Sequence, residues 1–212
     1  MTWPQNHAIP DAWRRQPLTS ITVEPSTEPL TLTEVKLYLR VTHSSEDALI
    51  TGLITAARVY CETKTRRAFV TKTITQQFRG FFDMISPLVL SHAPVASVSS
   101  VTYVDGDGAS QTLSSAWYRL VSQAGQKAGR AFLEPTDAFQ MPTLDATRAY
   151  PVTVTTVCGY GSASAVPDGI KAAMYLMIAE MYETRSESTE KGLKSQTTVD
   201  RLLAPYVLPE AA

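Results

Sequence analysis

The fold is decided by two neighbouring stretches, PLTLTEVKLYLRV at residues 29–41 and SSEDALITGLITAARVYCETKT at residues 44–65. In the first stretch, Thr31 and Glu34 have the spacing of a capping box, in which each side chain satisfies a free backbone N–H at the start of a helix. Apolar residues follow at helical spacing. We therefore expect a short helix that begins at Thr31 and ends near Arg40.

The second stretch predicts a longer helix that begins at Ser44 or Ser45 and reaches Thr65. Acidic residues stand in its first turn, where the helix dipole favours negative charge. Apolar residues recur every three or four positions, as on one face of an amphipathic helix. They are Leu49, Ile50, Leu53, Ile54, Ala57, Tyr60 and Cys61.

From residue 69 to residue 161 the hydrophobic period changes to two, which predicts a β-rich insertion of about five or six strands. Within it, DGDG at residues 105–108 is typical of a hairpin turn. Gly159 and Gly161 follow the last candidate strand. We interpret them as a structural turn, because the remaining glycines and the lysine of a phosphate-binding loop are missing. The loop at residues 134–150 has no clear period and is a candidate for a contact outside the subunit.

A third main helix is expected to begin at Pro167 and Asp168, since proline is well tolerated in the first helical turn. The run AAMYLMIA at residues 172–179 is apolar on every side. We therefore expect this helix to be buried by its own subunit on one side and by a neighbouring copy on the other, which predicts a homo-oligomer. Its candidate subunit-interface residues are Tyr175, Leu176 and Tyr182.

Both ends of the chain are expected to be arms. Residues 1–28 hold prolines among polar residues, which favours an extended arm. Trp3 and Trp13 on this arm either fold back on their own subunit or dock on a neighbour, and we prefer docking, which makes them further subunit-interface candidates. Residues 187–212 are expected to begin as a flexible polar linker and to end in a short amphipathic docking segment.

These boundaries make the chain an α+β protein. A small core of three to four helices, at residues 29–68 and 166–186, holds the β-rich insertion at residues 69–161. The arms at residues 1–28 and 187–212 flank it.

The charge balance and composition exclude several kinds of partner. The 212 residues include 19 Lys and Arg and 20 Asp and Glu, a net charge of −1. This disfavours a mainly electrostatic nucleic-acid binder, but not a protein through which DNA passes. No secretory signal and no run of about 18 apolar residues occur, so we expect a cytoplasmically made protein with no membrane contact. Cys61 and Cys158 are interpreted as core thiols rather than as a disulfide.

No arrangement of residues predicts an enzyme. His7, His43 and His92 do not have metal-ligand spacing from one another or from a cysteine, so neither a metal nor another cofactor is expected. No GxSxG motif is present. The residues favour an assembly protein, and the alternative from another class is a small carbohydrate- or peptide-binding module.

Several short motifs follow one another in a set order between residues 28 and 207. They are residues 29–41, residues 44–57, Tyr60 and Glu62 before TRRA at residues 65–68, CGYG at residues 158–161, Val166-Pro167 with Ile170-Lys171, Tyr182-Glu183 with Arg185, and LLAPY at residues 202–206. In this order they resemble the phage head-tail connector proteins, also called adaptor or head-completion proteins. The gp6-like connectors and the adaptors of gene transfer agents are similar.

The resemblance implies a structural protein of the virion neck, assembled in the bacterial host cytoplasm. Such proteins form a ring, usually twelve-fold, beneath the portal protein, and receive a stopper or tail protein on the other rim. Double-stranded DNA passes through the lumen without sequence-specific binding. The C-terminal segment would grip the portal, with four expected portal-binding residues: Arg201, Leu202, Leu203 and Tyr206. Another neck component, such as a stopper or tail-completion protein, is the nearest alternative.

Overall fold

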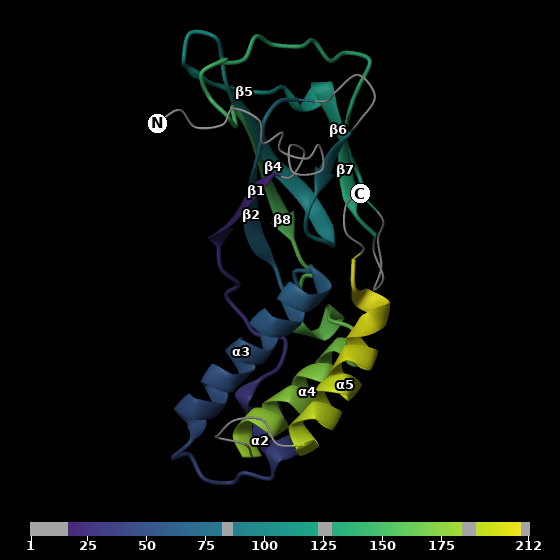
Figure 1. The fold of residues 1–212 in the computed structure, drawn as a ribbon. Coiled ribbons are helices and arrows are strands. Elements are labelled where there is room, and N and C mark those ends of the chain that lie inside the picture. Colours follow the sequence, from purple (N-terminus) through teal and green to yellow (C-terminus); the bar gives the residue numbers. More distant parts are fainter. Residues whose placement is uncertain (1–16, 82–86, 123–128, 184–189, 209–212) are drawn as a thin grey trace, which may run out of the picture.

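The structure, a computed structural model, describes residues 17–81, 87–122, 129–183 and 190–208. Its strands gather at one end and its helices at the other, so the molecule is elongated (Figure 1). Each end has its own hydrophobic cluster, which we call the helical core and the β core. This arrangement confirms the α+β prediction.

Among the residues that the structure describes, four α-helices build the helical end, and the first begins as the sequence predicts. The Thr31 hydroxyl accepts the N–H of Glu34 at 3.2 Å, and the Glu34 carboxylate accepts the N–H of Thr31 at 2.7 Å. At the other end, Arg40 has a φ of 59°, a left-handed conformation that closes many helices. The helices are α2 (Leu32–Leu39), α3 (Asp47–Thr65), α4 (Asp168–Glu183) and α5 (Glu190–Leu203).

The start of α3 differs from the prediction, whereas its end agrees. The N-cap is Glu46 rather than Ser44 or Ser45. The Ser45 hydroxyl lies 2.8 Å from Nδ1 of His43, so it is engaged with the preceding loop instead of the first turn of the helix. The helix reaches Thr65 as expected.

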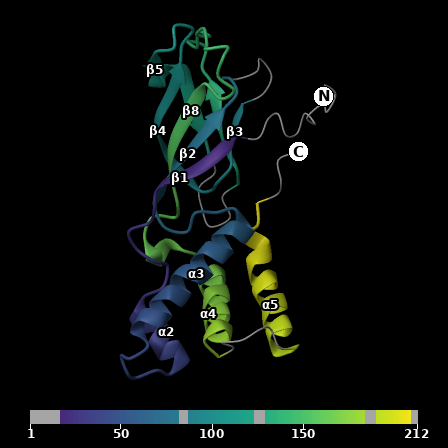
Figure 2. The ribbon, with the colours of Figure 1, turned by 60° about the vertical axis from the view of Figure 1, so that its left-hand side comes forward.

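The strands form two antiparallel sheets (Figure 2). The five-stranded sheet has the order β1-β2-β8-β4-β5, and the three-stranded sheet has the order β3-β7-β6. In β2 and β8 buried side chains alternate with more exposed ones, as expected for a sheet with one face on a core. The strands are β1 (Leu18–Val23), β2 (Lys72–Phe78), β3 (Leu88–Leu90), β4 (Val95–Val104), β5 (Ser110–Thr112), β6 (Tyr118–Val121), β7 (Ala131–Pro135) and β8 (Val152–Cys158).

The sequence underestimates the number of strands. In the described parts of residues 69–161 there are seven strands, β2 to β8, where five or six are expected. β3 and β5 have three residues each, which is too short for a period of two to become visible. The hairpin at residues 105–108 is confirmed, because β4 pairs with β5 across it and Gly108 has a φ of 82°.

The N-terminal arm is shorter than predicted. Leu18–Val23 forms β1, which pairs with β2 along one edge of the five-stranded sheet. This segment lies between prolines but contains none, and it is rich in β-branched residues, so it can pair as a strand. Trp3 and Trp13 lie outside the described residues.

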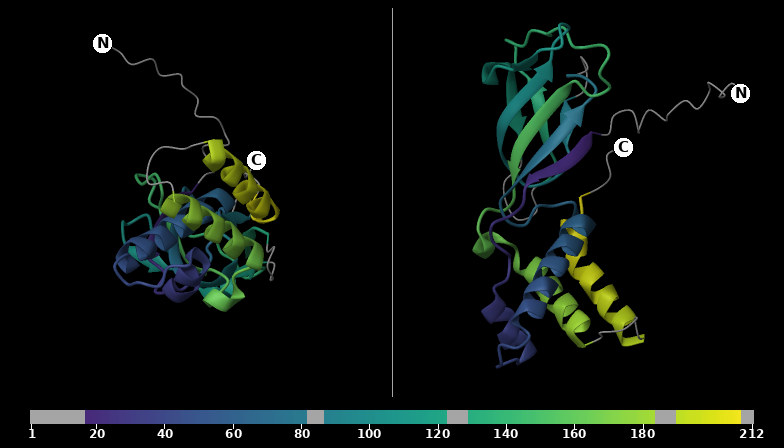
Figure 3. Two further views of the ribbon diagram at one scale, coloured as in Figure 1. Left: turned by 90° about the horizontal axis from the view of Figure 1, so that it is seen from below. Right: turned by 90° about the vertical axis from the view of Figure 1, so that its left-hand side faces the viewer.

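The predicted third helix is confirmed as α4, but its surroundings differ from the expectation. It lies against α3, α5 and α2, so three helices of its own chain cover it (Figure 3). Ile170, Met174 and Ile178 on α4 are fully buried in the helical core. The face that the sequence assigned to a neighbouring copy is covered by α5, which explains an all-round apolar helix without a second subunit.

The predicted flexible linker is wrong from residue 190 onward. Glu190–Leu203 forms α5, which runs beside α4 (Figure 1). Its sequence shows no helical hydrophobic period before Val199, so the pattern alone gives no sign of it. Val199, Leu203 and the following Leu208 are buried, and contact with the apolar α4 orders this segment.

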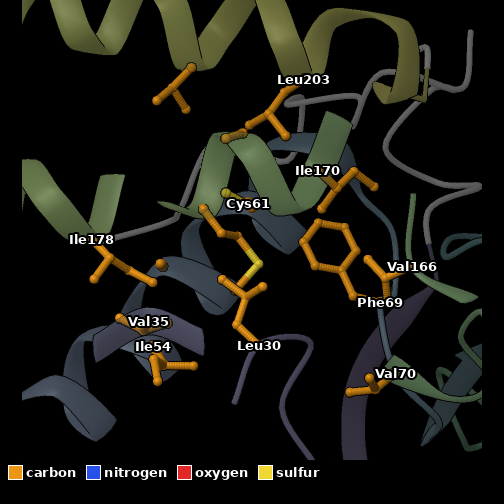
Figure 4. Packing of buried hydrophobic residues seen from close by; sticks show 14 of the residues in the cluster. Leu30, Val35, Ile54, Cys61, Phe69, Val70, Val166, Ile170, Ile178 and Leu203 are labelled. Carbon is orange, nitrogen blue, oxygen red and sulfur yellow. The ribbon is translucent and has the colours of Figure 1, made fainter. Parts of the chain in front are cut away.

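The helical core joins segments that are far apart in the sequence (Figure 4). Leu30, Cys61, Phe69, Ile170 and Leu203 meet in a single cluster. In this order, they lie in the segment before α2, in α3, in the connection between α3 and β2, in α4 and in α5. Segments from Leu30 to Leu203 are therefore needed to complete this core.

The CGYG run is a structural turn, as predicted. Gly159 has a φ of 125°, and a Cβ at this position would lie 2.4 Å from the carbonyl oxygen of Val70. Glycine is required there because the turn after β8 passes against the segment that leads into β2. This close approach joins the β sheet to the helical end.

Candidate assembly surfaces

The chemical groups that the sequence singled out are structural in this fold. Cys61 and Cys158 are free and buried, as predicted. Burial raises the pKa of the Cys61 thiol to about 12, so this thiol stays protonated at neutral pH. Within the described ranges, no group of three or more His, Cys, Asp or Glu residues could hold a metal ion. No helix in those ranges is long and apolar enough to cross a membrane.

α3 distributes its side chains in an unusual way. Between residues 48 and 63 its charged residues are Arg58 and Glu62, and both are buried. The side that points away from the helical core carries uncharged, exposed residues at spacings of three and four. We call it the α3 outer face: Leu49, Gly52, Ala56, Val59 and Thr63. Water-facing helix surfaces are normally charged or polar, so this face has the composition of a contact surface.

The buried charges of α3 hold the two ends of the molecule together. The Glu62 carboxylate accepts hydrogen bonds from Nη1 of Arg58 at 3.0 Å, Nζ of Lys72 at 2.9 Å and the backbone N–H of Phe69 at 2.7 Å. Arg58 also donates from Nε to Glu28 at 2.7 Å. We call these four charged side chains the ionic cluster. Because Lys72 opens β2, the cluster ties the end of α3 to the five-stranded sheet.

His92 lies within electrostatic reach of the ionic cluster. Burial, and then the positive charge of Lys72, lower the pKa of His92 to about 4. Its Nδ1 lies 2.8 Å from the Ser91 hydroxyl. His92 is therefore neutral at pH 7.

Two further apolar features face outward. Leu37 on α2 is 80% exposed and points away from the core, because it is two residues from the buried Val35. β1 forms one edge of the five-stranded sheet, and its Leu18, Ile21 and Val23 are exposed. An uncharged, apolar edge strand is a template for pairing with another chain.

The predicted subunit-interface residues of α4 have partners within their own chain. The ring of Tyr175 lies 4.8 Å from that of Tyr38, measured between centroids, and the Tyr182 hydroxyl donates a hydrogen bond to Glu46. Leu176 packs against the helical core. All three residues are partly buried, and their role between subunits stays a prediction.

The fold separates the four predicted portal-binding residues. Leu203 is fully buried in the helical core because α5 packs on α4, so in this conformation its side chain is covered, and its role as an apolar anchor for the portal stays a prediction. Leu202 and Tyr206 are partly buried against the same core, and the Tyr206 carbonyl accepts a hydrogen bond from Nε of Arg67 at 2.5 Å. Arg201 is exposed.

The sequence missed Leu37 and the α3 outer face. The hydrophobic pattern assigns Leu49 to the core-facing stripe, whereas the structure leaves it 43% exposed. The signal that separates the two faces is the position of the charges, since Arg58 and Glu62 fall on the core side of α3. A search for the uncharged side of each helix would have found this surface.

The part of the chain from α2 to β3 has the pattern of a known family. Residues 29–92 match the family model described as phage gp6-like head-tail connector protein. The resemblance inferred from the sequence motifs is confirmed. No curated protein sequence matches the chain.

Solved structures share this fold over nearly the whole chain. One, described as "Neck of empty GTA particle computed with C6 symmetry", has a TM-score of 0.73 at 22% identity and covers 92% of this chain and 97% of its own. "Virion of native gene transfer agent (GTA) particle" has a TM-score of 0.72 with the same identity and coverage. "Neck of native GTA particle computed with C12 symmetry" has a TM-score of 0.60 at 21% identity, over 91% of this chain and 98% of its own.

The two comparisons complement each other. The family match covers α2, α3 and the first strands after them. The structural likeness extends the same fold to both sheets with their connecting loops, which we call the β module, and to α4 and α5. Both comparisons point to structural proteins of phage or phage-like particles, since the family model describes head-tail connectors and the similar structures are described as particle necks and a virion.

Proposed function

We propose that this protein is a head-tail connector of a tailed phage or a phage-like particle. The observation that carries the proposal is the match of residues 29–92 to the connector family, within a fold that resembles neck proteins over 92% of the chain. In this role the protein joins the capsid at its portal vertex to the tail. It is assembled in the cytoplasm of the bacterial host.

The proposed assembly is a twelve-fold ring beneath the portal, with a stopper or tail protein on its other rim. Support comes from the similar neck structures, which were computed with C6 and C12 symmetry. The net charge of −1 suits a lumen through which double-stranded DNA passes, because a strongly basic wall would retain phosphate. Trp3 and Trp13 are proposed to contact a neighbouring subunit.

The proposed contact with the portal uses the C-terminal end of α5. Arg201 is exposed, while Leu202 and Tyr206 are partly buried and present only part of their surface. Removal of everything after Arg185 is not a clean test of this contact, because it also removes the buried Leu203 from the helical core.

The first experiment is deletion of the gene, followed by electron microscopy of the particles. We expect heads with a portal but no tail, together with free tails. Complementation with the intact gene restores attachment. Normal, infectious particles in the deletion strain would overturn the connector assignment.

A second experiment tests the portal contact with full-length protein. Arg201→Glu is expected to weaken retention of the protein on immobilised portal. Arg119→Glu, which changes an exposed arginine of the β module in the same way, serves as the control. Equal retention of both variants would remove Arg201 from the portal contact and leave the connector role to the deletion experiment.

A further inference from the structure

The most unusual surface of the molecule is the α3 outer face. It runs from Leu49 to Thr63, a length of about 21 Å at 1.5 Å per residue. Every charged side chain between these positions is buried, and the exposed positions carry small or apolar side chains and threonines. A helix face of this length without a charge is unusual in water and has the composition of a surface that another chain covers.

The centre of this face has room for a side chain from outside. A Cβ built on Gly52 meets no atom within 4 Å, and Ala56, one helical turn away, is exposed. Glycine inside an exposed helix lowers its stability relative to alanine. The small side chains at Gly52 and Ala56 therefore leave open space between Leu49 and Val59 for an apolar side chain from outside.

The occupant is best supplied by a second copy of the chain. Nucleic acid does not fit, because the face offers no lysine or arginine to phosphate. A lipid surface does not fit either, because helices that bind it carry basic residues along the polar side. A closed ring requires two different patches on each subunit, one receiving and one inserting.

Leu37 is the matching patch on the same subunit. It is the most exposed large apolar residue of the described chain, at 80%. It projects from α2, opposite Val35, and is therefore distinct from the α3 outer face. We propose that in the ring Leu37 of one copy inserts between Leu49 and Val59 of the next copy, against Gly52. This inference rests on the proposed function, since it assigns the contact between adjacent connector subunits.

Two single variants test the two patches. Gly52→Arg fills the receiving patch, and Leu37→Asp charges the inserting patch. Both positions are open within the subunit, so each variant is expected to keep the wild-type thermal unfolding midpoint and circular dichroism spectrum. The fraction of protein in rings, measured by native mass spectrometry of the full chain, should fall roughly tenfold or more.

Matched controls place the same chemical changes on the β module. Gly80→Arg introduces arginine at another glycine with no atom within 4 Å of its Cβ. Met141→Asp introduces a carboxylate at another exposed apolar residue. Both controls are expected to form rings as the wild type does. Rings that persist in Gly52→Arg or in Leu37→Asp would overturn the inference.

Mixing the two inactive variants gives the sharpest test. Gly52→Arg retains its inserting Leu37, and Leu37→Asp retains its receiving face, so together they should form a one-to-one dimer that cannot close into a ring. Two monomers after mixing, under conditions in which the wild type forms rings, would overturn the pairing of these two patches.

A disulfide test covers the case of weak association. The double variant Leu37→Cys with Ala56→Cys should give a ladder of covalent multimers on oxidation, while either single variant should give none. Cys61 and Cys158 are buried and do not compete. Absence of the ladder would overturn the inference, whereas portal binding by the same preparation would show that the connector role survives that failure.

Discussion

The β module and the central part of α3 place their charged residues in opposite ways. In the β module, Arg119 and Glu134 form an ion pair at 2.8 Å on the surface, above a core of apolar residues. At the helical end, Arg58 and Glu62 are buried and the outer face of the same helix is uncharged.

The difference indicates which end is complete as a single subunit. A surface ion pair is solvated whether or not the protein assembles. α3 packs its main apolar face into the helical core, but it also exposes Leu49 and Val59 on an outer face without charges, which is unusual for a helix surface that stays in water. We therefore expect the helical end to carry the contacts between subunits, and each of the following changes tests part of this comparison.

The largest expected effect is at the ionic cluster. Glu62→Gln removes the carboxylate that compensates Arg58 and Lys72, and we expect the free energy of unfolding to fall by about 3–5 kcal/mol, because a buried charge is left without its partner. Glu134→Gln breaks the exposed pair of the β module and should cost less than about 1 kcal/mol. Guanidinium unfolding of both variants measures the contrast, and equal losses would contradict it.

A similar effect is expected where α5 joins the helical core. Leu203→Ala creates a cavity beside α4 and should lower the free energy of unfolding by about 2–5 kcal/mol. Leu37→Ala makes the same change at an exposed position and should alter it by less than about 0.5 kcal/mol, measured at a concentration where the protein is monomeric. An unchanged free energy of unfolding in Leu203→Ala would mean that α5 does not stabilise the core.

The next effect depends on pH. The pKa of His92 falls from its ordinary value of 6.5 to about 4 in the folded protein, so between these values the unfolded chain binds a proton that the folded chain does not. The contribution of neutral His92 to the free energy of unfolding is fully present above pH 6.5. It is lost as the pH falls toward 4, and the loss from this group amounts to about 3 kcal/mol.

The variant His92→Gln isolates that contribution. It should lose less stability than the wild type between pH 6.5 and pH 4, and the difference between the two proteins should stay constant from pH 7 to pH 8. Urea unfolding at each pH gives the two curves. Parallel curves across the acidic range would contradict the assignment to His92.

The smallest effects come from the backbone conformation at the C-cap of α2 and inside α3. The free energy of unfolding should change in opposite directions at these two positions. Arg40 has a φ of 59°, which strains a residue with a Cβ, so Arg40→Gly should raise the free energy of unfolding by about 1 kcal/mol. Ala56→Gly, inside α3, should lower it by about 1 kcal/mol. Thermal unfolding of the two variants should therefore shift in opposite directions.

Signals between neighbouring residues in the sequence correctly predicted where two helices begin. The capping box at Thr31 and Glu34 gave the start of α2, and Pro167 with Asp168 gave the start of α4, because these interactions are made within one turn of the chain. The same reasoning misplaced the N-cap of α3, since Ser45 bonds to His43 instead. Short strands such as β3 left no period to detect.

The candidate assembly surface was predicted less well than the fold. The aromatic and apolar residues of α4 were chosen because the helix is apolar all round, but three helices of the same chain pack against it. Leu203 was chosen from a short amphipathic segment and turned out to be buried. In each case the pattern showed that a residue is covered, but not by which surface.

By itself, the sequence determined the α+β class, the helices α2 and α4, the hairpin at residues 105–108 and the resemblance to connectors, all of which depend on neighbouring residues or on motif order. The tertiary structure alone decided that residues 190–203 form α5, that β1 completes the sheet, and that α3 turns Arg58 and Glu62 inward. The physical reason is that burial depends on contacts between distant segments. A helical pattern specifies which residues share a face, while only packing specifies whether that face meets the core, a neighbouring helix or another subunit.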